Sequence, residues 1–137
     1  MREIEKRMWG NNKMNNFKTV EVEQLLDTPD YEDNDLINPN LLSMIYSLGR
    51  DAENEEEYQY ALNILLFLCD RKSQRVRANA ILAISMLAIN HKRLEYEIIR
   101  PIIKKTWEVA DDESRATIQD AVDDINFAMK WKIVVKA

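Results

Sequence analysis

The stretch from Ser73 to His91, SQRVRANAILAISMLAINH, constrains the fold more than any other part of the chain. It holds no glycine or proline, and at helical spacing one of its faces carries Val76, Ala80, Ala83 and Leu87. Further apolar residues flank that face on both sides: Leu82, Met86, Ile89, Ile81, Ile84 and Ala88. A helix that is apolar nearly all round must be covered by several neighbours. The sequence therefore predicts that residues 73–91 form the buried centre of a helical stack.

The composition agrees with an all-α protein folded as a single domain over residues 1–137. The 137 residues include only two glycines and three prolines, and 46% of them are hydrophobic. A single cysteine, Cys69, excludes an intramolecular disulfide and fits a reducing compartment. The charged N-terminus resembles no signal peptide, and no apolar run is long enough to cross a membrane. We therefore expect a cytoplasmic protein without a membrane partner.

Local signals divide the chain into helices. Asn38-Pro39 is a helix start, Asn54 with Glu57 is a capping pair, and Asp111 is a good N-cap. Residues 1–18 are expected to form a weak helix or mobile arm, 27–38 an acidic loop, and 132–137 a tail that packs back on the domain. Helices are expected over about 19–26, 39–49 (ending at Gly49), 54–70, 73–91, 93–109 (kinked or restarted at Pro101) and 111–129.

An internal repeat links these helices. At an offset of 38 residues Arg77 falls on Arg115, Ala83 on Ala121 and Leu87 on Ile125. The apolar positions of the preceding helices coincide at the same offset, while a third copy, one offset earlier, is weaker. A period of this length built from helix pairs is typical of an α-solenoid, in which each pair packs on its neighbours.

The segment ALNILLFLCDRKSQRVRANAILAISMLA also resembles a HEAT repeat. Its apolar first helix ends near Asp70, and its second helix opens with Val76-Arg77 followed by Ala80. The match is good over residues 57–91, fair over 93–129 and poor before 57. The resemblance implies a short right-handed α-solenoid of about three HEAT-like helix pairs, in which the Val-Arg opening serves packing.

In size, acidity and architecture, the chain is similar to small immunity proteins of bacterial contact-dependent toxin systems. That resemblance implies an antitoxin that binds and neutralises a cognate basic toxin, such as a nuclease, by occlusion. The net charge of −5 argues against nucleic acid as a partner. Oligomeric state is not predicted.

The sequence contains few residue patterns typical of a metal site or a catalytic site. One cysteine and one histidine cannot supply a zinc site of the Cys/His type, and the acidic stretches lack the central glycine of a calcium-binding EF-hand loop. A nucleophilic pair of Cys69 and His91 is conceivable, but a buried, inert cysteine and a capping or surface histidine are the simpler interpretation. We expect no enzyme activity, cofactor or metal.

The final helix carries the candidate binding residues. We predict that seven of its residues contact a partner: Asp112 and Glu113 in its first turn, and, on its expected outward face, Asp120, Asp123, Asp124, Phe127 and Trp131. Aromatic residues among carboxylates are typical of a protein interface, although the tail or the N-terminal arm could instead cover both aromatic rings. Two other functions stay open: an adaptor that binds a peptide along its concave face, and an enzyme or enzyme subunit.

Overall fold

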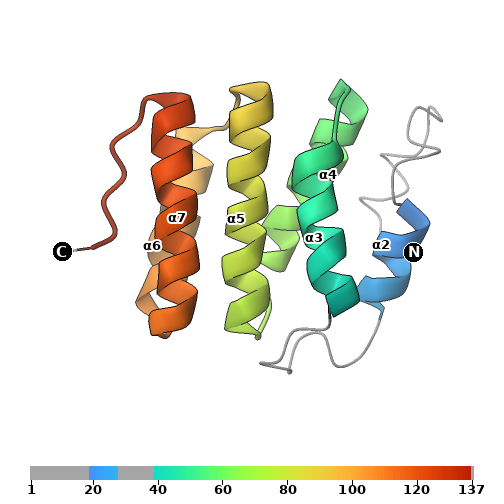
Figure 1. Ribbon diagram of the computed structural model, residues 1–137, viewed down its shortest axis with the longest axis horizontal. Helices are drawn as coiled ribbons and strands as arrows, with labels where there is room; N and C mark the ends of the chain where they lie inside the picture. The colour runs from blue at the N-terminus through green and yellow to red at the C-terminus, as the bar shows by residue number, and fades with distance from the viewer. Residues whose placement is uncertain (1–18, 28–38, 137) are drawn as a thin grey trace.

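The computed structural model describes residues 19–27 and 39–136, and every regular element in these ranges is an α-helix. Figure 1 shows two layers: α3, α5 and α7 run parallel to one another in one layer, and α4 and α6 lie behind them in the opposite direction. Helix α2 packs beside α3. The bounds are α2 Thr19–Leu26, α3 Pro39–Asp51, α4 Glu55–Leu68, α5 Gln74–His91, α6 Tyr96–Glu108 and α7 Asp112–Met129.

Helix α5 is the buried centre, as its sequence predicts. It packs against α3, α4, α6 and α7, so neighbours cover it on several sides. Val76, Ala83 and Leu87 are fully buried. Arg77 donates hydrogen bonds from Nη1 to the carbonyls of Arg71 (2.6 Å) and Lys72 (2.7 Å), which ties the α4–α5 turn to the first turn of α5. The Val-Arg opening therefore serves packing.

The ends of α5 and α7 repeat one another at the 38-residue offset found in the sequence. Ser73 and Asp111 are their N-caps, and each side chain accepts a hydrogen bond from a backbone amide three residues later. Both helices are 18 residues long, and each is followed by a lysine in the left-handed region, Lys92 at φ 53° and Lys130 at φ 59°. The capping box predicted at Asn54 and Glu57 is present as well.

Helix α3 does not end at Gly49 as predicted, but continues to Asp51. Gly49 is buried with ordinary helical geometry, so it does not serve as a C-cap. A Cβ atom placed on it would lie 2.3 Å from the carbonyl oxygen of Ala83 in α5. The missing side chain therefore lets α3 and α5 approach closely, and this long-range requirement explains a glycine that looks like a stop signal in the sequence.

Helix α6 also differs from its prediction, because it begins at Tyr96 rather than near Arg93 and runs through Pro101 to Glu108 without a break. Pro101 lies on the exposed side, while Ile99 and Ile103 are buried on either side of it. Their packing holds the turns before and after the proline in one helix. Glu95, directly before α6, has an extended backbone, and the carbonyl of Arg93 accepts a hydrogen bond from the Tyr58 hydroxyl at 2.7 Å.

The C-terminal tail packs on the α6–α7 end of the stack, as expected. Ile133 is buried, and both its amide and its carbonyl bond the Asn126 side chain at 2.9 Å. Lys104 of α6 donates to the carbonyl of Val134. The predicted arm 1–18 and the predicted acidic loop beyond Asp27 lie outside the described residues, as does Asn38.

Among the residues that the structure describes, no helix combines the length and the apolarity needed to cross a membrane.

Candidate protein interface

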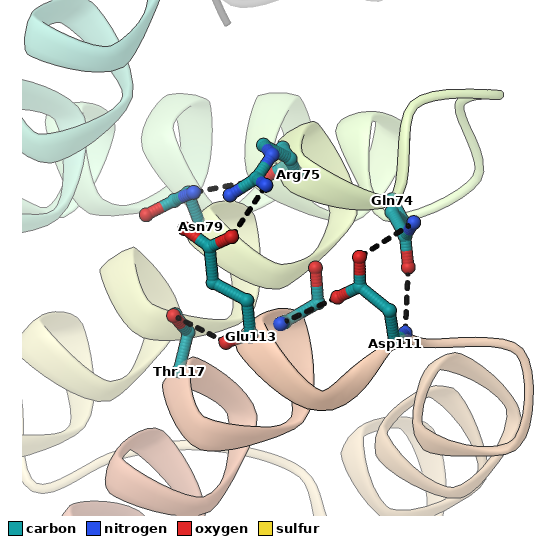
Figure 2. A network of polar contacts seen from close by, with 7 residues as sticks. Gln74, Arg75, Asn79, Asp111, Glu113 and Thr117 are labelled. Atoms are coloured by element: carbon teal, nitrogen blue, oxygen red, sulfur yellow. Dashed lines mark hydrogen bonds and ion pairs between the residues drawn. The ribbon is translucent and has the colours of Figure 1, made fainter. Parts of the chain in front are cut away.

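A polar network joins the first turns of α5 and α7 and sets the orientation of α7 (Figure 2). Gln74 and Asp111 exchange two hydrogen bonds: the Gln74 amide donates to Oδ2 of Asp111 (3.1 Å), and the Asp111 backbone N–H donates to Oε1 of Gln74 (2.7 Å). Beside them, Arg75 Nη2 lies 2.5 Å from Glu113 Oε2. Two parallel helices tied in this way cannot rotate freely about their axes, so the same side of α7 always faces outward.

The outward side of α7 is almost wholly acidic. Its buried side holds Ile118, Ala121, Val122 and Ile125. The exposed residues of this helix contain five carboxylates and no cation: Asp112, Glu113, Ala116, Asp120, Asp123, Asp124 and Phe127. We call this set the α7 acidic face. Six of the seven predicted contact residues belong to it, and the helical period places them together.

The five carboxylates are not equivalent. The hydrogen bond from Arg75 is the main cause that lowers the pKa of Glu113, so this carboxylate joins α5 to α7 rather than standing free for a partner. Asp123 accepts a hydrogen bond from Gln119 at 2.9 Å, which leaves its second oxygen available. Asp112, Asp120 and Asp124 are exposed. These three and Asp123 are the groups that best fit contact with a cationic partner.

Phe127 is the most exposed large hydrophobic residue among those described, with 82% of its surface accessible. The tail therefore does not cover it, contrary to the alternative raised from sequence. It stands on the same side of α7 as Asp123, one turn before it, and Asp120, two turns before it. An exposed aromatic side chain surrounded by carboxylates is typical of a protein interface in which the aromatic residue is the anchor and the charged residues form the rim.

Trp131 does not lie on this face, so that part of the prediction is wrong. The left-handed conformation of Lys130 ends α7 at Met129 and turns the chain, so Trp131 no longer follows the helical period. Its half-buried ring contacts Tyr96 of α6 edge-on, with ring centroids 5.0 Å apart. Trp131 thus packs on α6, whereas the alternative interpretation expected the tail or the N-terminal arm to cover it.

A groove borders the α7 acidic face on the side of the tail, with a volume of about 630 Å³. The guanidinium of Arg115 lies 4.8 Å from the centroid of the Trp107 ring and donates to the Trp107 carbonyl, which shapes one wall. The residues that line the groove are Trp107, Asp112, Arg115, Ala116, Gln119, Asp120, Val135 and Lys136. Sequence reasoning missed the residues from α6 and the tail, because no local pattern places them beside α7.

Cys69 and His91 do not form a nucleophilic pair. They flank α5 at opposite ends, and 18 helical residues separate them by roughly 27 Å. Burial raises the pKa of the Cys69 thiol to about 12. His91 is half-buried, and its Nε2 atom lies 2.9 Å from the carbonyl oxygen of Ala52, so it joins α5 to the α3–α4 connection.

No protein-family model, curated protein or solved structure matches this chain. Within the described ranges, no group of three or more histidine, cysteine or acidic side chains is arranged to hold a metal ion. Helical architecture alone does not select a function, so the surface of the molecule is what bears on it.

Proposed function

We propose that this chain is a non-enzymatic protein-binding module, and specifically a cytoplasmic immunity protein that neutralises a cognate basic toxin. The observation that carries the proposal is the α7 acidic face, where an 82% exposed phenylalanine stands among carboxylates without an exposed cation on the same helix. Its binding partner would present basic side chains around an apolar pocket that accepts Phe127.

We also propose that the described helices belong to a short right-handed α-solenoid of HEAT-like pairs. The repeated caps and left-handed lysines of α5 and α7 support this architecture, as does the arrangement of two layers. In the described stack the α7 acidic face is exposed and therefore available to a partner. The architecture therefore supplies a rigid outward face, bordered by the groove beside the tail.

The proposed mechanism is occlusion. A nuclease toxin must hold phosphates with cationic side chains, and the carboxylates of α7 would occupy those side chains in place of the nucleic acid. Complementary charge speeds encounter and selects the partner, whereas a buried aromatic anchor supplies most of the affinity. The inhibitor needs no chemistry of its own, which agrees with the buried thiol of Cys69.

The decisive experiment is calorimetry against the product of a toxin gene adjacent to the gene for this chain. We expect binding at submicromolar concentration, with the double variant Asp120→Lys/Asp124→Lys weakened at least about tenfold, or about 1.4 kcal/mol. The control Glu97→Lys/Glu108→Lys makes the same change in net charge on exposed positions of α6. It should bind like the wild type. Absence of binding at micromolar concentration would reject the proposal. An equal loss of affinity in both double variants would show that the binding site is not on α7.

Phe127 gives a second test that does not involve charge. Because its side chain is exposed, Phe127→Ala should leave the urea midpoint of unfolding unchanged while weakening the complex at least about tenfold. Val134→Ala, which removes another exposed apolar side chain, serves as the control. Unchanged toxin affinity for Phe127→Ala would show that the ring is not an anchor.

A further inference from the structure

A second surface lies on the other layer, between α4 and α6. Both helices pack on the layer of α3, α5 and α7 rather than mainly on one another, so a seam is left between them. Two hollows lie in it, one of about 80 Å³ that includes Leu62, Leu66 and Ile98, and one of about 170 Å³ that includes Asp70 and Lys105.

The two hollows lie along one side of α6. On α4, Leu62 and Leu66 are four residues apart and stay on one side of the helix, whereas Asp70 lies in the turn that follows α4. On α6, Ile98 and Lys105 are seven residues apart and likewise share a side. The half-buried Ile102 lies between them, four residues after Ile98 and three before Lys105. Both hollows therefore lie along the same side of α6, and we call the strip between α4 and α6 that holds them the α4–α6 seam.

The upper end of the seam, near the start of both helices, is apolar. Ile98 is 43% exposed, and Leu62 and Leu66 beside it are only half-buried. Of the charged groups at its rim, Arg93 Nη1 lies 2.5 Å from Glu55 Oε1, and the exposed Glu95 also lines the hollow. This end suits a large apolar side chain.

The lower end is cationic. Arg71, Arg77 and Lys105 line the hollow, against the single carboxylate of Asp70. The Lys105 Nζ atom lies 3.5 Å from Asp70 Oδ1, but these side chains are 78% and 75% exposed, and so loose a surface pair is worth little. An incoming carboxylate can therefore displace Asp70 from Lys105. Arg77 is held in place by its bonds to the carbonyls of the α4–α5 turn.

We propose that the α4–α6 seam is a docking groove for an acidic–apolar peptide segment of a partner protein. Ile98 and Lys105 are separated by roughly 10 Å along the axis of α6, at 1.5 Å per residue. An extended chain covers that distance in about three residues. The segment therefore carries a large apolar side chain and a carboxylate about three positions apart. This partner is opposite in charge to the one that fits the α7 acidic face, and the two surfaces are independent.

The seam is tested by selecting a phage-displayed library of random peptides on the immobilised full-length protein. We expect enrichment of peptides with a carboxylate about three positions from a leucine, isoleucine or aromatic residue. These peptides should bind Lys105→Glu and Ile98→Asn at least about tenfold more weakly than the wild type. Circular dichroism of both variants checks that they are folded.

Each variant has a matched control. At 100° per residue Arg100 lies about 160° around α6 from Ile98, whereas Lys105 lies about 20° away, so Arg100→Glu makes the same charge change outside the seam. Ile89 on α5 is 40% exposed, close to Ile98, so Ile89→Asn makes the same polar change elsewhere. Both controls, and Asp120→Lys/Asp124→Lys, should bind the peptides normally.

Three outcomes would overturn the proposal. The first is failure to enrich any acidic–apolar peptide, and the second is equal binding of enriched peptides to the seam variants and the wild type. The third is self-association in analytical ultracentrifugation that Lys105→Glu abolishes, because the groove would then hold a second copy of this chain.

Discussion

The close approach of α3 and α5 at Gly49 supports a prediction whose size follows from the structure. In Gly49→Ala the new Cβ would lie 2.3 Å from the Ala83 carbonyl oxygen, whereas ordinary contacts of such atoms fall at 3.4–4 Å. The two helices would have to move apart locally by about 1 Å, the range in which packed atoms lose a quarter to a half of their dispersion energy. Ile45 and Leu48, both fully buried on α3, would be displaced with the backbone.

The expected magnitude is the balance of two terms. Overpacking of a core costs typically 1–3 kcal/mol, and the upper end applies here because a backbone carbonyl cannot rotate away. The better helix propensity of alanine returns about 1 kcal/mol. We therefore expect Gly49→Ala to lower the free energy of unfolding by about 2 kcal/mol. Adding Ala83→Gly should not restore it, because the clash involves the carbonyl rather than the side chain of Ala83.

Urea denaturation followed by far-ultraviolet circular dichroism measures this change. Ser43→Ala, an exposed position of α3, is the control and should alter stability by less than about 0.5 kcal/mol. An unchanged or raised urea midpoint for Gly49→Ala would refute the reasoning. It would mean that α3 and α5 are not pressed together at this point, and that Gly49 is an ordinary weak helix residue.

Three further predictions concern single groups. Cys69, with its thiol buried and its pKa raised to about 12, should react with iodoacetamide at pH 8 at least about 100-fold more slowly in the native protein than in urea. The pKa of Asp111 is lowered mainly by the Ser114 backbone hydrogen bond and that of Glu113 by Arg75, so their stabilisation is complete above the ordinary carboxyl values of roughly 4 and is lost as the pH falls below them. As the pH is lowered through this range, the urea midpoint should therefore decrease less in Asp111→Asn than in the wild type. An equal decrease in both proteins would contradict this assignment. Lys130→Gly should raise stability by about 0.5–1 kcal/mol by relieving a left-handed lysine, a gain that thermal unfolding would detect and that a lowered Tm would disprove.

The amino-acid sequence determined the helices and most of their ends. The bonds that make the caps at Asn54 and Asp111 join residues three apart, so they depend on little beyond the local chain. The burial of α5 could also be predicted from the sequence, because apolar residues on nearly all sides of a helix leave no polar face for solvent. The 38-residue repeat and the acidic side of α7 follow from spacing alone.

The tertiary structure decided what depends on residues distant in the chain. Gly49 looks like a helix stop until the Ala83 carbonyl is placed against it, and Trp131 looks outward until Lys130 turns the chain toward Tyr96. The pairing of Arg75 with Glu113 joins residues 38 positions apart and removes one predicted contact residue from the free acidic set. The groove beside α7 and the α4–α6 seam arise only when separate helices and the tail are brought together. Local periodicity shows which way a side chain points from its own helix, but only packing decides what it meets there.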